Sequence, residues 1–99
     1  MNREWYLDIV RHDGRNLLAV IDTQARTVEF EALDGADATD VVRALRNVMM
    51  RTVPGWPRAI ITDQHRLLTG LGEKIGVEQR LSCPSIQRIV ERRIREALA

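Results

Sequence analysis

Residues 4–21, EWYLDIVRHDGRNLLAVI, determine how the first part of this chain folds. From Glu4 to Val10 the side chains alternate with a period of two, which is typical of a half-buried β-strand. Asp13 and Gly14 form one of the residue pairs that most strongly favour a tight hairpin. Because the apolar run from Leu17 to Ile21 follows at once, the segment predicts two antiparallel strands joined by a short turn.

The chain after this hairpin changes from strand to helix. A turn at residues 22–26 leads into a third predicted strand, Thr27 to Leu33, which again alternates by two. From Asp37 the period becomes about 3.6, which is typical of an amphipathic helix on a sheet. Its apolar face contains Val41, Val42, Leu45, Val48 and Met49. Asp37 or Thr39 can cap its start, and the segment from Pro54 to Pro57 ends it.

The second half of the sequence alternates between strands and helices. Ala59 to Thr62 is short, apolar and bounded by turn residues, so it predicts a buried strand parallel to the first. Leu67 to Ile75 predicts a helix that two internal glycines weaken and that Gly76 ends. Residues 77–81 predict a fifth strand, and apolar residues at helical spacing between 86 and 98 predict a last helix.

Length and composition limit the possible classes of protein. Ninety-nine residues suffice for one compact domain, so residues 1–99 are expected to form a single domain. No stretch approaches the roughly 20 apolar residues that a membrane span needs, and the first residues do not resemble a secretory signal. A cytoplasmic location without membrane contact is therefore expected. The single Cys83 excludes an internal disulfide and a thiolate zinc site, and His12 and His65 are isolated.

The net charge of +1 is unevenly distributed along the chain. Residues 1–50 carry six Arg and nine acids, whereas residues 51–99 carry nine Lys and Arg and five acids. Fourteen of the fifteen basic residues are Arg, which could favour bidentate contacts with phosphate. A GC-rich genome would produce the same bias. Arg88, Arg92 and Arg95 on the last helix could follow a nucleic-acid backbone or form an ordinary solvated face.

Three carboxylates stand at the most informative positions. Asp8 interrupts the first strand and shares its face with Tyr6 and Val10, Asp63 follows the fourth strand, and Glu91 lies at the border of the apolar stripe of the last helix. Mg²⁺ and Mn²⁺ prefer oxygen ligands, and a pair of such ions can activate a phosphodiester. If the three acids converge, the sequence predicts a two-metal site.

Each acid also has a structural explanation. Asp8 could be a solvated residue on a half-exposed sheet, and Asp63 could cap the helix that follows it. Glu91 could form helical ion pairs with Arg88 and Arg95, which contribute only a few tenths of a kcal/mol, on the order of 0.2–0.5. A further acid near a strand end, Asp22, is interpreted as a turn residue.

The predicted order β-β-β-α-β-α-β-α, together with short motifs at matching spacing, resembles the catalytic core of retroviral integrases and DDE transposases. The matching pieces cover almost the whole chain: Trp5-x-Leu7-Asp8, Gly14, Leu18-Ala19-Val20, Val28-Glu29, Gly55-Trp56-Pro57, Thr62-Asp63, Gly76-Val77-Glu78-Gln79, Cys83-Pro84 and Glu91. The resemblance implies an α/β, ribonuclease H-like fold. Its five-stranded mixed sheet would have three antiparallel strands, then two parallel ones, and about three flanking helices.

The same resemblance implies a function. In that family the acids matching Asp8, Asp63 and Glu91 are catalytic and bind two Mg²⁺ or Mn²⁺ ions, which activate water or a DNA 3′-hydroxyl for attack on a phosphodiester. DNA would be the partner, in integration or recombination of a mobile element. Further partners would be copies of this chain or a full-length recombinase.

The sequence also departs from the family pattern. Gln64-His65 stands where relatives usually have Asn-Gly after the second aspartate, and only 27 residues separate Asp63 from Glu91. Six residues, 85–90, replace a longer loop rich in glycine and proline. Three hypotheses follow: an active polynucleotidyl transferase or nuclease, an inactive integrase-like module that binds DNA or protein, and an unrelated α/β domain in which the acids never meet.

Overall fold

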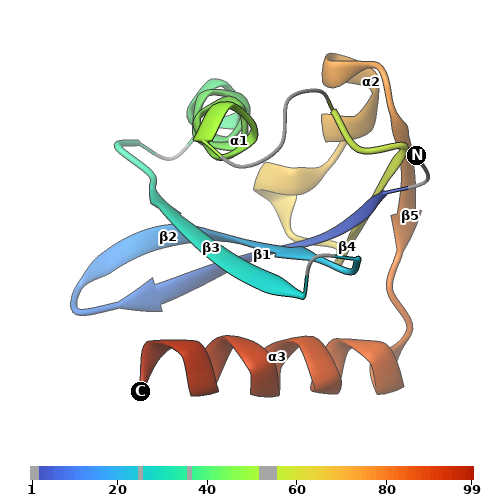
Figure 1. The fold of residues 1–99 in the computed structure, drawn as a ribbon. Helices are drawn as coiled ribbons and strands as arrows, with labels where there is room; N and C mark the ends of the chain where they lie inside the picture. The colour runs from blue at the N-terminus through green and yellow to red at the C-terminus, as the bar shows by residue number, and fades with distance from the viewer. Residues whose placement is uncertain (1–2, 25, 36, 52–55) are drawn as a thin grey trace.

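The computed structural model describes residues 3–24, 26–35, 37–51 and 56–99 of the chain. Five strands form one sheet, and helices cover both of its faces (Figure 1). In chain order the elements are β1 (Glu4–His12), β2 (Arg15–Asp22), β3 (Thr27–Ala32), α1 (Ala38–Arg51), β4 (Ala59–Thr62), the 3₁₀ helix η1 (Arg66–Leu68), α2 (Leu71–Ile75), β5 (Glu78–Leu81) and α3 (Pro84–Leu98).

The sheet has the strand order β3-β2-β1-β4-β5. β1 pairs antiparallel with β2 and parallel with β4, and β4 pairs parallel with β5. This confirms the predicted mixed sheet of three antiparallel and two parallel strands. β1 is central, so it has neighbours on both sides.

The hairpin between β1 and β2 turns at the predicted pair. Asp13 and Gly14 both have positive φ, 52° and 75°, as a two-residue hairpin with a primed turn requires. Because pairing continues as far as His12 opposite Arg15, both strands are longer than the alternation alone predicts.

One face of the sheet carries the larger core. α1, η1 and α2 lie on this face, above the sheet in Figure 1. The most deeply buried large side chains here include Trp5, Leu18, Leu45, Ile60, Leu68 and Leu71. Of the two predicted caps of α1, Asp37 is the one used, because its Oδ1 accepts hydrogen bonds from the backbone N–H groups of Thr39 and Asp40. The predicted stop at Pro54-Gly55 lies outside the described residues, and α1 ends at Arg51.

The segment after β4 differs from its prediction as one helix, because glycine divides it in two. η1 ends at Leu68 and α2 begins at Leu71, with Gly70 between them at φ 72°. A left-handed residue cannot continue a helix, so the apolar residues belong to two short elements. Gly76 ends α2 as predicted, again with a left-handed φ of 76°.

The opposite face of the sheet is covered by α3 alone (Figure 1). Four apolar side chains of the described residues are buried in this second core: Ala19, Ile21, Val90 and Ile94. Tyr6 and Val10 contact it from β1, so the even-numbered residues of β1 face α3, as the alternation predicts. Among the described residues, every helix is too short or too polar to cross a membrane.

Candidate functional site

Asp8 is a carboxylate inside the sheet face that α3 covers. It lies on β1 between Tyr6 and Val10, and only 7% of its surface is exposed. Its Oδ1 accepts a hydrogen bond of 2.9 Å from the backbone N–H of Ile9. Asp8 is therefore not the solvated surface residue of the structural explanation.

The electrostatic environment of Asp8 connects it to the other two acids. The pKa of Asp8 is raised from 3.8 to about 6, mainly by burial and then by the negative charges of Asp63 and Glu91. The bond from Ile9 and the nearby His65 oppose this shift. Both predicted partners thus lie close enough for their charges to act on Asp8.

The parallel pairing of β1 with β4 explains why Asp63 lies near Asp8. Glu4 pairs with Ala59 and Tyr6 with Ile61, a constant difference of 55 in residue number. β4 ends at Thr62, so Asp63 lies one residue beyond the strand, and the same difference of 55 leads us to expect it near Asp8. The effect of the Asp63 charge on the pKa of Asp8 agrees with this expectation.

Asp63 does not cap the helix after it. Its Oδ1 accepts a hydrogen bond of 3.1 Å from the backbone N–H of His65, which makes a local turn. The side chain of His65 caps η1 instead, because its Nδ1 accepts from the N–H of Leu67 at 3.2 Å. The structural explanation of Asp63 as a helix cap is wrong.

Glu91 reaches the same region from α3. It is exposed, and with Asp8 it lines a groove of about 270 Å³ between β1 and α3. We call this the β1–α3 groove; its other lining residues are Val10, Arg11, Ile94, Arg95 and Leu98. In the described ranges no ion pair within 4.0 Å includes Glu91, so the suggested pairs with Arg88 and Arg95 are not formed.

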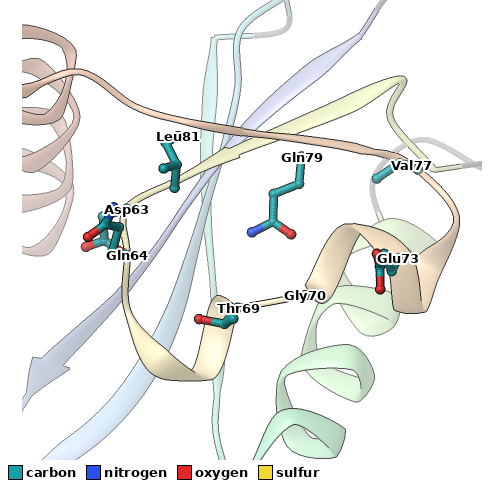
Figure 2. A pocket seen from close by; sticks show the side chains of 8 residues that line it. All are labelled: Asp63, Gln64, Thr69, Gly70, Glu73, Val77, Gln79 and Leu81. Carbon is teal, nitrogen blue, oxygen red and sulfur yellow. The ribbon is translucent and has the colours of Figure 1, made fainter.

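A larger pocket opens on the other side of Asp63. We call it the β4–β5 pocket; it measures about 570 Å³ and is lined by Asp63, Gln64, Thr69, Gly70, Glu73, Val77, Gln79 and Leu81 (Figure 2). Figure 2 shows Asp63 and Glu73 at opposite ends of this pocket, with Gln79 between them. Asp63 thus lines the β4–β5 pocket, and its charge also raises the pKa of the buried Asp8.

Gln79 holds the segment that carries Asp63. Its Nε2 donates to Thr62 Oγ1 at 2.9 Å and to the Leu68 carbonyl at 2.8 Å, while its Oε1 accepts from the N–H of Gly72 at 2.7 Å. Gly72 is required here, because a Cβ at this position would come within 2.7 Å of the Gln79 Cβ. Both ends of the loop after β4 are consequently tied to β5.

The three acids are near one another without forming a compact cluster. In the part of the chain that the structure describes, no group of three His, Cys, Asp or Glu side chains is arranged closely enough to hold a metal ion. Asp8 and Asp63 come from neighbouring strands, and Glu91 approaches from a separate helix. A shared metal site remains a prediction for these residues.

Positive charge lies beside the acids on α3. Arg88, Arg92 and Arg95 are exposed and, together with Ile89 and Glu91, line a shallow hollow of about 350 Å³. Across the described ranges the ion pairs include none of these three arginines. Their charge is therefore available to an anionic partner, although no contact with DNA is established.

Asp22 has a structural role at the end of β2. Its Oδ2 accepts from the indole Nε1 of the buried Trp5 at 3.1 Å, and its Oδ1 accepts from the N–H of Gln24 at 3.0 Å. The second bond is the turn contact that the sequence predicts. The bond from Trp5 could not be predicted, because Trp5 is distant along the chain.

Sequence reasoning missed three residues around the acids. His65 caps η1 and influences Asp8, Gln79 ties the loop after β4, and Arg11 lines the β1–α3 groove. Of these three, only His65 has a signal in the sequence, because it belongs to the Gln64-His65 pair that departs from the family pattern.

The strand order, the mixed pairing and the helices on both faces define the ribonuclease H-like fold of integrase catalytic cores. The catalytic core domain of BIV integrase has this fold, with a TM-score of 0.76 and 17% identity, over 99% of this chain and 68% of that one. A chain of the simian T-cell lymphotropic virus intasome in complex with PP2A regulatory subunit B56 gamma has a TM-score of 0.73 and 17% identity. That match covers 92% of this chain and 36% of the other. Comparisons with protein-family models and with curated protein sequences found no match.

Proposed function

We propose that this chain is an integrase-like core that acts on DNA phosphodiesters, by strand transfer or by nucleolytic cleavage, with Asp8, Asp63 and Glu91 as metal ligands. The observation that carries the proposal is the parallel pairing of β1 with β4, because its register leads us to expect Asp63 near the buried Asp8. The charge of Glu91 acts on the same carboxylate. Two integrase-type structures with this fold support the choice of substrate class.

The donor set suits Mg²⁺ or Mn²⁺. All three ligands offer carboxylate oxygen, which these hard cations prefer. Burial and the negative charges of the two other acids disfavour the ionised form of Asp8. A bound divalent ion would reduce that repulsion. Because the acids do not yet form a compact cluster, we expect the exposed Glu91 side chain to move toward Asp8 on binding.

Within this proposal the residues of the protein have separate roles. Bound divalent ions would supply a Lewis acid for the phosphate and an activated oxygen nucleophile. Asp8 and Asp63 would hold them against the sheet, and Glu91 would close the site from α3. Arg88, Arg92 and Arg95 would bind phosphates of the same DNA and orient the reactive one.

The test is a calorimetric titration with Mn²⁺ of the wild type and of Asp8→Asn, Asp63→Asn and Glu91→Gln. We expect saturable binding by the wild type and at least about tenfold weaker binding by each variant, since each loses an anionic ligand. Asp37→Asn is the matched control, because Asn also caps helices and Asp37 lies at the start of α1. Equal Mn²⁺ uptake by all five proteins would show that the acids do not bind metal.

A second measurement separates catalysis from binding alone. Metal-dependent cleavage or strand transfer with labelled duplex DNA, lost in all three acid variants, supports the active form. Salt-dependent DNA binding that survives in the three variants, with no product at any Mn²⁺ concentration, would instead assign an inactive DNA-binding module. We further propose that the chain works as an oligomer, because a chain of the same fold is part of an intasome.

A further inference from the structure

We infer that the flank of α3 opposite Glu91 is a docking surface for an acidic protein segment that inserts a bulky apolar side chain. The surface is centred on a cleft of about 230 Å³ between α3 and the turn that joins β2 to β3. We call it the α3 cleft; its lining residues are Tyr6, Ile21, Asp22, Thr23, Arg26, Ile86, Ile89, Val90 and Arg93. This inference does not depend on metal binding.

The floor of the α3 cleft is apolar. Ile21 and Val90 are buried, and Tyr6 and Ile86 pack against them in the second core. A cleft of this size can accept one large side chain, and apolar floors provide most of the affinity in such contacts. The second core is thus open at this end, in contrast to the larger core on the other face.

Ile89 extends the apolar surface beyond the cleft. Its side chain is 58% exposed, so it is one of three large apolar side chains that are exposed to solvent among the described residues. Ile89 lines both the α3 cleft and the neighbouring hollow of Arg88 and Arg92. A continuous surface of this kind, larger than a small ligand needs, favours a protein segment as the occupant.

The rim of the cleft is positively charged. Arg26 and Arg93 line it from two elements, and the Nη2 of Arg93 donates to the backbone carbonyl of Arg26 at 3.1 Å. The only acid in the lining, Asp22, is buried and accepts bonds from Trp5 and Gln24. The cleft therefore complements a carboxylate next to an apolar group, and Arg can bind that carboxylate with two parallel bonds.

Hydrogen bonds hold the backbone of Arg26 at the rim of the cleft. Arg26 has a φ of 56°, one of two non-glycine residues with positive φ in the described chain. Its N–H donates to the Asp22 carbonyl at 2.9 Å, and Arg93 binds its carbonyl, so neighbours on both sides hold this conformation. These bonds fix the positions of Arg26 and Arg93 at the rim of the cleft.

The first test uses the fluorescent probe 8-anilinonaphthalene-1-sulfonate and its uncharged analogue N-phenyl-1-naphthylamine, which has the same apolar body. We expect the sulfonate to bind about tenfold more tightly than the analogue, because only the sulfonate can contact the arginines. Arg93→Gln should remove that difference and Arg93→Lys should keep part of it. Ile89→Ser should weaken both probes.

Met50→Ser and Arg46→Gln are the matched controls, since they make the same changes at exposed residues of α1 on the other face. A melting curve for each variant excludes loss of the fold. If the Ile89 and Arg93 variants bind both probes like the wild type, the α3 cleft is not the site and the inference is overturned.

The second test identifies the occupant by displacement of the sulfonate probe. A short synthetic peptide of Asp, Leu and Phe should displace it, whereas a peptide with Lys for Asp, or with Ser for Leu and Phe, should not. Displacement by the Asp and Ser peptide would show plain charge attraction, and no displacement by any peptide would assign a small anionic ligand; either result overturns a protein partner. Mn²⁺ binding by the Arg93 variants separately reports whether the proposed metal site is intact.

Discussion

The two faces of the sheet differ in how completely they are covered. α1, η1 and α2 bury a large apolar core on one face, whereas α3 covers the other face alone and leaves a groove on each flank. The acids, the exposed arginines and Ile89 all belong to the half-covered face or its edge. One face therefore holds most of the apolar core, whereas the other keeps Glu91, the arginines and Ile89 exposed.

The largest effect should come from the fully covered face. Leu45 on α1 has no exposed surface, so Leu45→Ala should reduce the free energy of unfolding by about 3 kcal/mol through lost burial and a remaining cavity. Urea denaturation measures this change. Mn²⁺ affinity of the folded fraction should stay at the wild-type level, and a proportional loss would show that the two faces are coupled.

The second effect concerns Asp8 and depends on pH. Because the pKa of Asp8 is raised from 3.8 to about 6, the folded state binds the Asp8 proton more tightly than the unfolded state does. Ionisation of Asp8 therefore lowers the stability of the folded state as the pH rises from 3.8 to about 6. Asp8→Asn should therefore increase the free energy of unfolding at pH 8 by at most about 3 kcal/mol. Urea denaturation at pH 8 and at pH 3.5 checks the sign. The gain should become small at the lower pH, where Asp8 is mostly protonated in both states, and an equal gain at both pH values would contradict a charge effect.

The third effect concerns Gln79, whose hydrogen bonds hold the loop after β4. Gln79→Leu removes three hydrogen bonds and leaves the Leu68 carbonyl and Thr62 hydroxyl without their donor, which should cost about 2 kcal/mol of stability. Because this loop carries Asp63, Mn²⁺ affinity should also fall, as calorimetry would show. A variant that loses stability but binds Mn²⁺ normally would show that Asp63 does not need Gln79.

The smallest effect on stability should come from the exposed arginines. Changing Arg88, Arg92 and Arg95 together to Gln should alter the free energy of unfolding by less than about 0.5 kcal/mol. The slope of log affinity for duplex DNA against log salt should fall by about 2 to 3, one for each lost phosphate contact. The double variant Arg43→Gln, Arg46→Gln on α1 is the control, and an equal change of slope there would place DNA elsewhere.

The sequence was sufficient for most of the fold. Alternation located β1, β3 and β5, apolar runs located β2 and β4, and the Asp13-Gly14 pair located the hairpin, because these signals are local. The division between η1 and α2 at the left-handed Gly70 was not predicted. It involves the hydrogen bond from Gln79 to the Leu68 carbonyl, and Gln79 lies on β5, which comes later in the chain. Tertiary contacts decided that segment.

The candidate site was predicted less completely. The placement of Asp8 on the face of Tyr6 follows from the period of a strand, but its burial requires α3 above it. The spacing of the sequence could not show that His65 rather than Asp63 caps η1, because both residues can accept the bond. Whether the three acids share a metal is a question of side-chain positions, which no sequence pattern encodes.

The central position of β1 has a consequence for the order of folding. Its antiparallel partner β2 follows after two turn residues, but its parallel partner β4 lies 55 residues further along. Local pairs form early and distant pairs slowly, so the three-stranded meander should form first and expose the second edge of β1 until β4 arrives. An edge left open in this way is prone to pair with another chain, so we expect refolding yield to fall as protein concentration rises.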